Sequence, residues 1–251
     1  MPQYDFRSPR LFVEDALESG LEVELDRGHA NYLVNVLRLK GGADVLVFNG
    51  RDGEWRAGLV LAGKKSVRLA VGEQTRPQPA PGDLHYLFAP LKHARLDYVV
   101  QKAVEMGASR LQPVITRHTQ VQRVNLERMR ANAIEAAEQC GILVIPEIAE
   151  PLALDAFVRG WAPERLLVFC DEAAEVKDPV AALSTARADA LAPTPVTLLI
   201  GPEGGFAEDE RAALMALPNV LRLALGPRIL RADTAAVAAL TLVQAVLGDW
   251  R

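Results

Sequence analysis

The spacing of apolar residues differs between the two parts of the chain. In the first part, short Val- and Leu-rich runs recur between Gly, Asn and Asp residues, and residues 28–39 interrupt them with helical spacing. Short strands with turn residues at close spacing are typical of small barrels. The predicted strands are residues 10–13, 44–50, 54–63 and 65–72.

Beyond residue 83, apolar runs alternate with segments of helical spacing. Residues 94–107 and 125–141 are predicted helices, and Gly107 and Gly141 stand where C-terminal caps are expected. Short Leu/Val runs are typical of strands buried on both faces. This alternation predicts an α/β domain with an open, mostly parallel sheet covered by helices. The predicted strands are residues 84–90, 110–116, 165–172, 195–200 and 220–225.

A proline-rich stretch separates these parts. "TRPQPAPGD", residues 75–83, has three prolines and a glycine, as a linker would. We therefore expect domains at residues 1–74 and 84–251. The last predicted helix is apolar nearly all round from Ala235 to Leu247, so it should be buried on every side, either in the core or in a subunit interface.

Composition narrows the class of protein. Half of the 251 residues are hydrophobic, which allows a sizeable core, and no run has the length of a membrane-spanning helix. The N-terminal residues carry charges where a signal peptide needs an apolar stretch. Cys140 and Cys170 have no paired spacing, so neither a disulfide framework nor a structural zinc site is expected. We expect a cytoplasmic protein.

The net charge of −4 does not by itself exclude a nucleic-acid partner. Residues 1–76 hold 11 Lys/Arg and 11 Asp/Glu, whereas the rest holds 17 and 21. The excess acid lies entirely in the second part. A basic face remains possible in the first part, because the distribution of charge matters more than its sum.

Residues 201–205, "GPEGG", follow a predicted strand directly. Ligands of open α/β sheets bind beyond the carboxyl ends of the strands. A phosphate-binding P-loop would need a GK[ST] ending and a dinucleotide fingerprint would need G-x-G-x-x-G, and both are missing. The acidic residues 208–210 would repel a pyrophosphate at the next helix. The loop predicts a ligand without phosphates, or a tight turn with no ligand.

A second loop strengthens the ligand interpretation. Gly226 and Pro227 leave another predicted strand, and we expect this strand to neighbour the first. Backbone amides and carbonyls of two such loops could recognise a nucleoside by hydrogen bonds. S-adenosylmethionine is such a ligand, since it carries adenosine and a cationic sulfonium but no phosphate. Glu203 could complement its positive charge, although an ordinary turn carboxylate is an equal explanation.

Several motifs together resemble one enzyme family. "RSPRLF", "HANYLVNVLRLKGG", "LKHARLDYVVQKAVEMGA", "EAAEQCG", "IPEI", "LLIGPEGG" and "LGPRILR" occur in this order. They are similar to the small-subunit ribosomal RNA uracil-N(3) methyltransferases, of the SPOUT class. The resemblance implies a PUA-like RNA-binding barrel, an α/β domain with a C-terminal trefoil knot, and S-adenosylmethionine as cofactor. It also implies a homodimer that acts on small-subunit ribosomal RNA or the assembled subunit.

The resemblance places the cofactor against the two Gly-Pro loops. The cofactor-binding residues expected on this basis are Leu199, Ile200, Gly201, Pro202, Glu203, Gly204, Gly205, Leu223, Leu225, Gly226, Ile229 and Leu230. The RNA contacts expected from phosphate neutralisation are Arg7, Arg10, Arg38, Lys64, Lys65, Lys92 and Arg117, each of which alone could be a solvated charge. The histidines show no metal spacing, and no metal is expected.

The chemistry implied by the family needs three things from the protein. N3 lies on the Watson–Crick edge, so the base must be turned out and oriented. Negative charge that develops on the uracil carbonyls needs stabilisation, and Arg231 is the candidate, unless it only forms a salt bridge to Asp233. Glu203 or Asp233 could accept the proton. No covalent intermediate is expected.

Some residues depart from the family pattern. Asp233 stands where Glu is common, Ile142 where Arg is common and Thr116 where an acid is common. Two other functions compete with this one. One is a SPOUT ribose 2'-O-methyltransferase, which the Arg-x-Pro-Arg stretch disfavours. The other is a non-catalytic RNA-binding ribosome-assembly protein, which the departures leave open.

Overall fold

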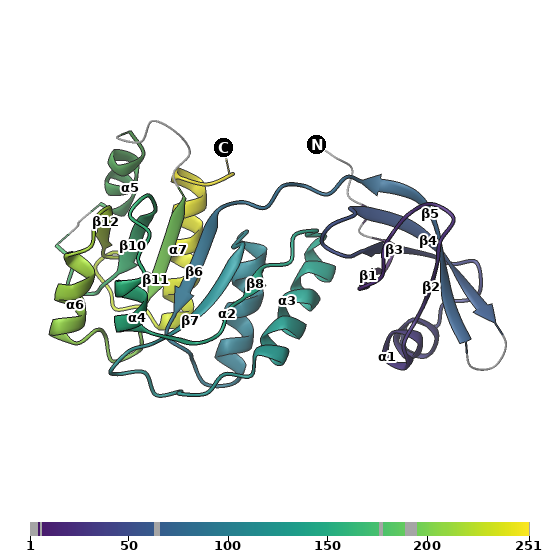
Figure 1. Cartoon of the computed structure of the whole chain (residues 1–251), viewed down its shortest axis with the longest axis horizontal. Helices are drawn as coiled ribbons and strands as arrows, with labels where there is room; N and C mark the ends of the chain where they lie inside the picture. The colour runs from purple at the N-terminus through teal and green to yellow at the C-terminus, as the bar shows by residue number, and fades with distance from the viewer. Residues whose placement is uncertain (1–4, 6, 63–65, 176–177, 189–194, 251) are drawn as a thin grey trace. The chain divides into compact units, whose positions relative to one another are not determined.

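The computed structural model describes residues 5, 7–62, 66–175, 178–188 and 195–250. The chain forms two compact units (Figure 1). The first unit is Met1–Ala80 with Ala137–Ile145, and the second is Pro81–Ala136 with Pro146–Arg251. The inclusion of residues 137–145 in the first unit has no counterpart in the sequence pattern.

The first unit contains a five-stranded sheet in the order β1-β3-β4-β5-β2. The strands are β1 (Arg10–Phe12), β2 (Glu22–Glu24), β3 (Asp44–Phe48), β4 (Glu54–Ala62) and β5 (Ser66–Arg76). β1 and β3 are parallel, and the other pairs are antiparallel. The sequence pattern missed β2, because only its central Val23 is buried. The helical interruption is α1 (Arg27–Asn31), capped by the Asp26 side chain, followed by the π-helical turn η1 (Tyr32–Val36).

The second unit contains a parallel sheet in the order β12-β10-β11-β6-β7-β8, with β9 paired to β7. The strands are β6 (Leu84–Phe88), β7 (Arg110–Ile115), β8 (Glu147–Ile148), β9 (Leu152–Ala153), β10 (Leu166–Cys170), β11 (Val196–Ile200) and β12 (Val220–Leu223). Every pairing of these strands is parallel. All residues of β11 are buried, as expected for a strand with both faces covered.

Helices alternate with the strands of this sheet. They are α2 (Ala94–Glu105), α3 (Leu126–Cys140), α4 (Leu154–Arg159), α5 (Pro179–Ala188), α6 (Glu208–Met215) and α7 (Ala232–Val246). α2 and α5 both contact α7, whereas α4 contacts α6. The predicted α/β alternation is therefore confirmed. Within the part of the chain that the structure describes, no helix combines the length and apolar character that a membrane span requires.

The last helix, α7, buries one side within the second unit. Its buried residues are Ala236, Ala239, Leu240, Val243 and Gln244. Leu242 is half-buried and Ala245 is exposed, so a single chain does not enclose the helix on every side. The apolar side that remains accessible is consistent with the interface interpretation and leaves it a prediction.

Candidate functional site

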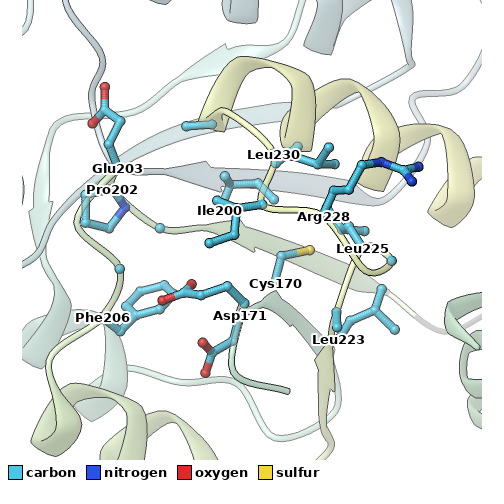
Figure 2. Close-up of a pocket in the computed structure, with 18 of the residues that line it drawn as sticks. Cys170, Asp171, Ile200, Pro202, Glu203, Phe206, Leu223, Leu225, Arg228 and Leu230 are labelled. Carbon is cyan, nitrogen blue, oxygen red and sulfur yellow. The ribbon is translucent and has the colours of Figure 1, made fainter. Parts of the chain in front are cut away.

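A pocket of about 340 Å³ lies at the carboxyl ends of three strands (Figure 2). Cys170, Ile200 and Leu223, the last residues of β10, β11 and β12, all line it. The two Gly-Pro loops meet here, but the expectation that they follow directly neighbouring strands is wrong. β10 lies between β11 and β12 in the sheet. The loops still share one pocket, because the carboxyl ends of parallel strands lie at the same edge.

The central strand β10 contributes an acidic corner that the sequence analysis did not identify. The Asp171 side chain is fully buried, and its Oδ2 lies 2.5 Å from Arg211 Nε and 2.8 Å from Arg222 Nε. The Ala173 N–H donates to Oδ1 at 3.1 Å. Burial would raise the pKa of Asp171, but these donors lower it below its ordinary value. Asp171 is therefore a charge already neutralised by its neighbours.

Cys170, the last residue of β10, adjoins this acidic corner. Burial, together with the neighbouring Asp171 carboxylate, raises the pKa of Cys170 to about 12. The thiol therefore stays protonated and acts as a small apolar group in the pocket wall.

The GPEGG loop needs glycine at two positions for different reasons. A Cβ on Gly201 would lie 2.8 Å from the Phe206 ring, which is buried and packs edge-to-face on Phe169. Gly205 has a φ of +69°, and a Cβ there would lie 2.6 Å from Glu172 Oε1. The loop backbone therefore passes close to its surroundings at these two positions, where only glycine fits.

A loop after β7 holds GPEGG from the other side. His118 Nδ1 lies 3.1 Å from the Gly204 carbonyl oxygen and 3.0 Å from that of Gly205. Both partners are acceptors, so we assign the proton to Nδ1. The neighbouring Arg117 pairs with Asp209 of α6 at 2.5 Å. These contacts fix the conformation of the glycine loop through residues far away in the sequence.

The electrostatic character of the pocket favours a cation. Besides Asp171, which Arg211 and Arg222 neutralise, the lining holds the carboxylates of Glu172 and Glu203 and one guanidinium, that of Arg228. Apolar side chains of β11, β12 and the second loop supply the rest of the wall (Figure 2). The pocket therefore suits a ligand with an apolar or aromatic group and a positive charge, and disfavours phosphates.

The structure brings together every predicted cofactor-binding residue except Leu199. Leu199 is fully buried and packs in a core cluster with Phe169 and Phe206. Side chains alternate between the two faces of a strand, so Leu199 points away from its neighbour Ile200. The lining residues that the sequence analysis missed are Cys170, Asp171, Glu172, Phe206, Ala224, Pro227, Arg228, Ala232 and Ala235.

The predicted catalytic residues are arranged differently from the expectation. Glu203 lines the pocket, whereas Arg231 and Asp233 do not. Arg231 is exposed and begins α7 as its N-terminal cap residue. Among the described residues, the Asp233 carboxylate pairs with Arg95 Nε at 3.8 Å and not with Arg231. Arg95 Nη1 also lies 3.9 Å from Glu203 Oε1, so the cation beside both predicted carboxylates is Arg95.

Arg10 departs from its predicted role in RNA binding. Its side chain is only 4% exposed, and Nε donates to Glu54 Oε2 at 2.7 Å. Arg76 Nη2 pairs with the same oxygen at 2.6 Å. This buried cluster belongs to the core of the first unit, so Arg10 contributes to stability and has little surface to offer RNA.

The other predicted RNA contacts occupy different environments. Arg7, Arg38 and Lys92 are exposed, and Arg38 has a φ of +55°. Arg117 is engaged by Asp209, as described above. Lys64 and Lys65 lie outside the described residues. Within the described ranges, no group of three or more His, Cys, Asp or Glu side chains could hold a metal ion.

Comparison with known proteins places the chain in a family. Residues 78–244 match the family described as an RNA methyltransferase domain, and residues 25–71 match an RNA methyltransferase PUA domain. The chain belongs to the ribosomal RNA small subunit methyltransferase E family. A member from Rickettsia conorii is 30% identical over 94% of both chains. Another, from Synechocystis, is 33% identical over 90% of this chain and 73% of its own length.

Two solved structures of similar proteins contain S-adenosylmethionine. A methyltransferase from Legionella pneumophila is 31% identical, with a TM-score of 0.81 and coverage of 95% of this chain and 98% of its own. A ribosomal RNA small subunit methyltransferase E from Neisseria gonorrhoeae is 25% identical, with a TM-score of 0.84 and coverage of 98% and 100%. The predicted PUA-like and α/β organisation agrees with these relatives.

Proposed function

We propose that the protein binds S-adenosylmethionine in the pocket at the ends of β10, β11 and β12. There it methylates N3 of a uridine in small-subunit ribosomal RNA. One observation carries the proposal: in a chain of this family, the backbones of two Gly-Pro loops converge on a single pocket with acidic walls. The relatives' bound cofactor supports the same assignment.

The residues present fit this cofactor. Leu223, Leu225 and Leu230 provide apolar surface for an adenine ring, and the loop amides and carbonyls provide hydrogen bonds. Glu172 and Glu203 complement a positive charge without forming a phosphate site. When bound, the cofactor supplies an electrophilic methyl group on a sulfonium sulfur. The chain's part is to bind it, exclude water from it and aim the reacting nitrogen at it.

The uridine must reach the pocket unpaired, because N3 lies on the Watson–Crick edge. The reaction balances when N3 forms the new N–C bond, its proton passes to a carboxylate, and the cofactor sulfur keeps the electrons of the broken S–C bond. Glu203 is the preferred proton acceptor because it lines the pocket. Arg231 and Asp233, at the start of α7, remain candidates for contacts with the nucleotide.

We further propose that residues 1–74 form a domain that binds the RNA substrate. Residues 75–83 link it to the catalytic domain, residues 84–251, which contains a trefoil knot. Exposed Arg7, Arg38 and Lys92 are candidates for phosphate contacts. The accessible apolar side of α7 supports a homodimer. The cytoplasm is the expected compartment, since its ribosomes supply the substrate.

Calorimetric titration tests the proposal at its first step. We expect S-adenosylmethionine to bind to one site per chain, and NAD not to bind because its pyrophosphate would face carboxylates. Transfer of labelled methyl groups from S-adenosylmethionine to small subunits lacking the modification tests the second step. Failure to bind the cofactor would refute the methyltransferase assignment. Binding with label on a ribose would identify a 2'-O-methyltransferase.

A further inference from the structure

Three charged side chains lie together at the edge of the cofactor pocket. Arg95, on α2, lies between Glu203 of the first loop and Asp233 of α7, with closest N–O distances of 3.9 and 3.8 Å. The Arg95 side chain is 44% exposed and that of Glu203 is 39% exposed. Figure 2 shows the Glu203 carboxylate directed away from Cys170 and Ile200. These groups can therefore be reached from solvent beside the pocket.

Arg95 and Glu203 keep their hydrogen-bonding atoms free. Their separation of 3.9 Å exceeds a hydrogen bond, and neither side chain makes another one within the described part of the chain. Asp171 differs, because Arg211 and Arg222 already occupy its carboxylate. An exposed guanidinium with unused N–H groups beside a carboxylate with unused lone pairs can bind a group that matches both.

The geometry points to Arg95 and Glu203 as the pair that recognises the imide edge of the target uracil. Uracil presents a carbonyl acceptor next to the N3–H donor. In this arrangement Arg95 donates to the O4 carbonyl while Glu203 accepts from N3–H. This inference rests on the proposed uridine methylation and names the groups that select the base.

The pair also explains discrimination against cytosine. Cytosine has an amino donor where uracil has the O4 carbonyl, and its N3 is an acceptor. Arg95 N–H groups would then face a donor, and the Glu203 carboxylate would face a lone pair. Once a bound base excludes water from Arg95 and Glu203, a base with the opposite polar pattern leaves both groups without hydrogen-bond partners, so the site rejects it.

The same contacts assist the reaction. As N3 loses its proton to Glu203, negative charge moves onto the carbonyl oxygen that Arg95 contacts, and the cation stabilises it. Asp233 acts as a positioning residue, since its Oδ1 accepts from the Thr234 N–H at 2.8 Å while Oδ2 faces Arg95. Arg95 thus takes the role that the sequence analysis assigned to Arg231.

The test compares Arg95→Gln, Arg95→Lys and Glu203→Gln with Arg159→Gln as the control. Arg159 makes an exposed ion pair with Asp155 on α4 and does not line the pocket. Each variant is titrated with S-adenosylmethionine, and its kcat and KM are measured on small subunits lacking the modification. We expect Arg95→Gln to lower kcat/KM by about 100-fold with cofactor affinity unchanged, and Arg95→Lys to recover part of the rate.

A pH profile separates the two roles. The deficit of Glu203→Gln should shrink as pH rises, because hydroxide replaces the missing proton acceptor. An Arg95→Gln rate within threefold of wild type would overturn the inference. So would a parallel loss of cofactor binding, which would show that Arg95 only holds the loops, or a large defect in Arg231→Gln with none in Arg95→Gln. Failure of the wild type to form methylated uridine would instead refute the proposed function.

Discussion

Replacement of Asp171 by asparagine removes one charge from the floor of the pocket while keeping the shape of the side chain. In the native chain this carboxylate is fully buried and bound by Arg211 and Arg222. Asparagine would leave the Arg222 guanidinium without this anion and Arg211 with only the Glu172 carboxylate, 3.8 Å away. It would also turn an N–H2 donor toward at least one of the two guanidinium groups.

The size of the effect follows from burial. Removing one partner of a buried ion pair costs about 3–5 kcal/mol. The side chains of Arg211 and Arg222 are 22% and 25% exposed, so water can compensate them in part. We therefore expect about 3 kcal/mol, at the lower end of that range. For a chain of this size that corresponds to a fall in Tm of roughly 6–12 °C.

Thermal unfolding by circular dichroism measures the change, with Asp155→Asn as the matched control. Asp155 and Arg159 form an ion pair whose side chains are 68% and 70% exposed. The control should shift stability by less than about 0.5 kcal/mol. If Asp171→Asn lowered Tm no more than the control, the charge network would not stabilise the site and the reasoning would be wrong.

The pH dependence of Tm, compared between wild type and Asp171→Asn, tests the same ion pairs a second time. The guanidinium and backbone donors lower the pKa of Asp171 below its ordinary value of 3.8, despite its burial. The stability that it contributes is therefore fully present above pH 3.8 and is lost as pH falls through the folded-state pKa. The difference in Tm between wild type and Asp171→Asn should narrow in acid. A constant difference would contradict the assignment.

Two further predictions concern the glycine loops. His118→Ala removes the donor to the Gly204 carbonyl, a hydrogen bond that contributes about 1 kcal/mol. The loss should weaken S-adenosylmethionine binding about fivefold in a calorimetric titration. An unchanged affinity would count against the contact. In urea unfolding, Gly201→Ala should cost about 1–3 kcal/mol, because its Cβ meets the buried Phe206 ring. Gly226→Ala should lower the free energy of unfolding by less, about 1 kcal/mol. Its φ of +88° disfavours alanine, but a Cβ there would meet nothing within 4 Å. A larger loss of stability in Gly226→Ala than in Gly201→Ala would refute this comparison.

Local sequence patterns predicted much of the fold and part of the site. The strand-to-loop transitions at Gly201 and Gly226 were readable because glycine, proline and buried runs act over a few residues. The alternation of strands and helices was readable for the same reason. The order of the strands could not be read from the sequence, because no local pattern encodes it. The position of β10 between β11 and β12 was therefore missed.

The residues that sequence reasoning missed or misplaced depend on distant partners. Asp171 follows a strand as many surface acids do, and only the fold brings Arg211 and Arg222 to it. Arg95 precedes Glu203 by more than a hundred positions. Arg10 belongs to a charged N-terminal motif and was predicted to contact RNA, yet its side chain is buried in an ion pair with Glu54. In each case a tertiary ion pair decided the environment.

Nucleoside mass spectrometry of the product RNA tests the central claim most directly. The protein is incubated with labelled S-adenosylmethionine and small ribosomal subunits lacking its modification, and the RNA is then digested to nucleosides. We predict label in 3-methyluridine alone. Label in a 2'-O-methylated nucleoside would contradict the proposed reaction, and absence of label together with absence of cofactor binding would show that the protein is not a methyltransferase.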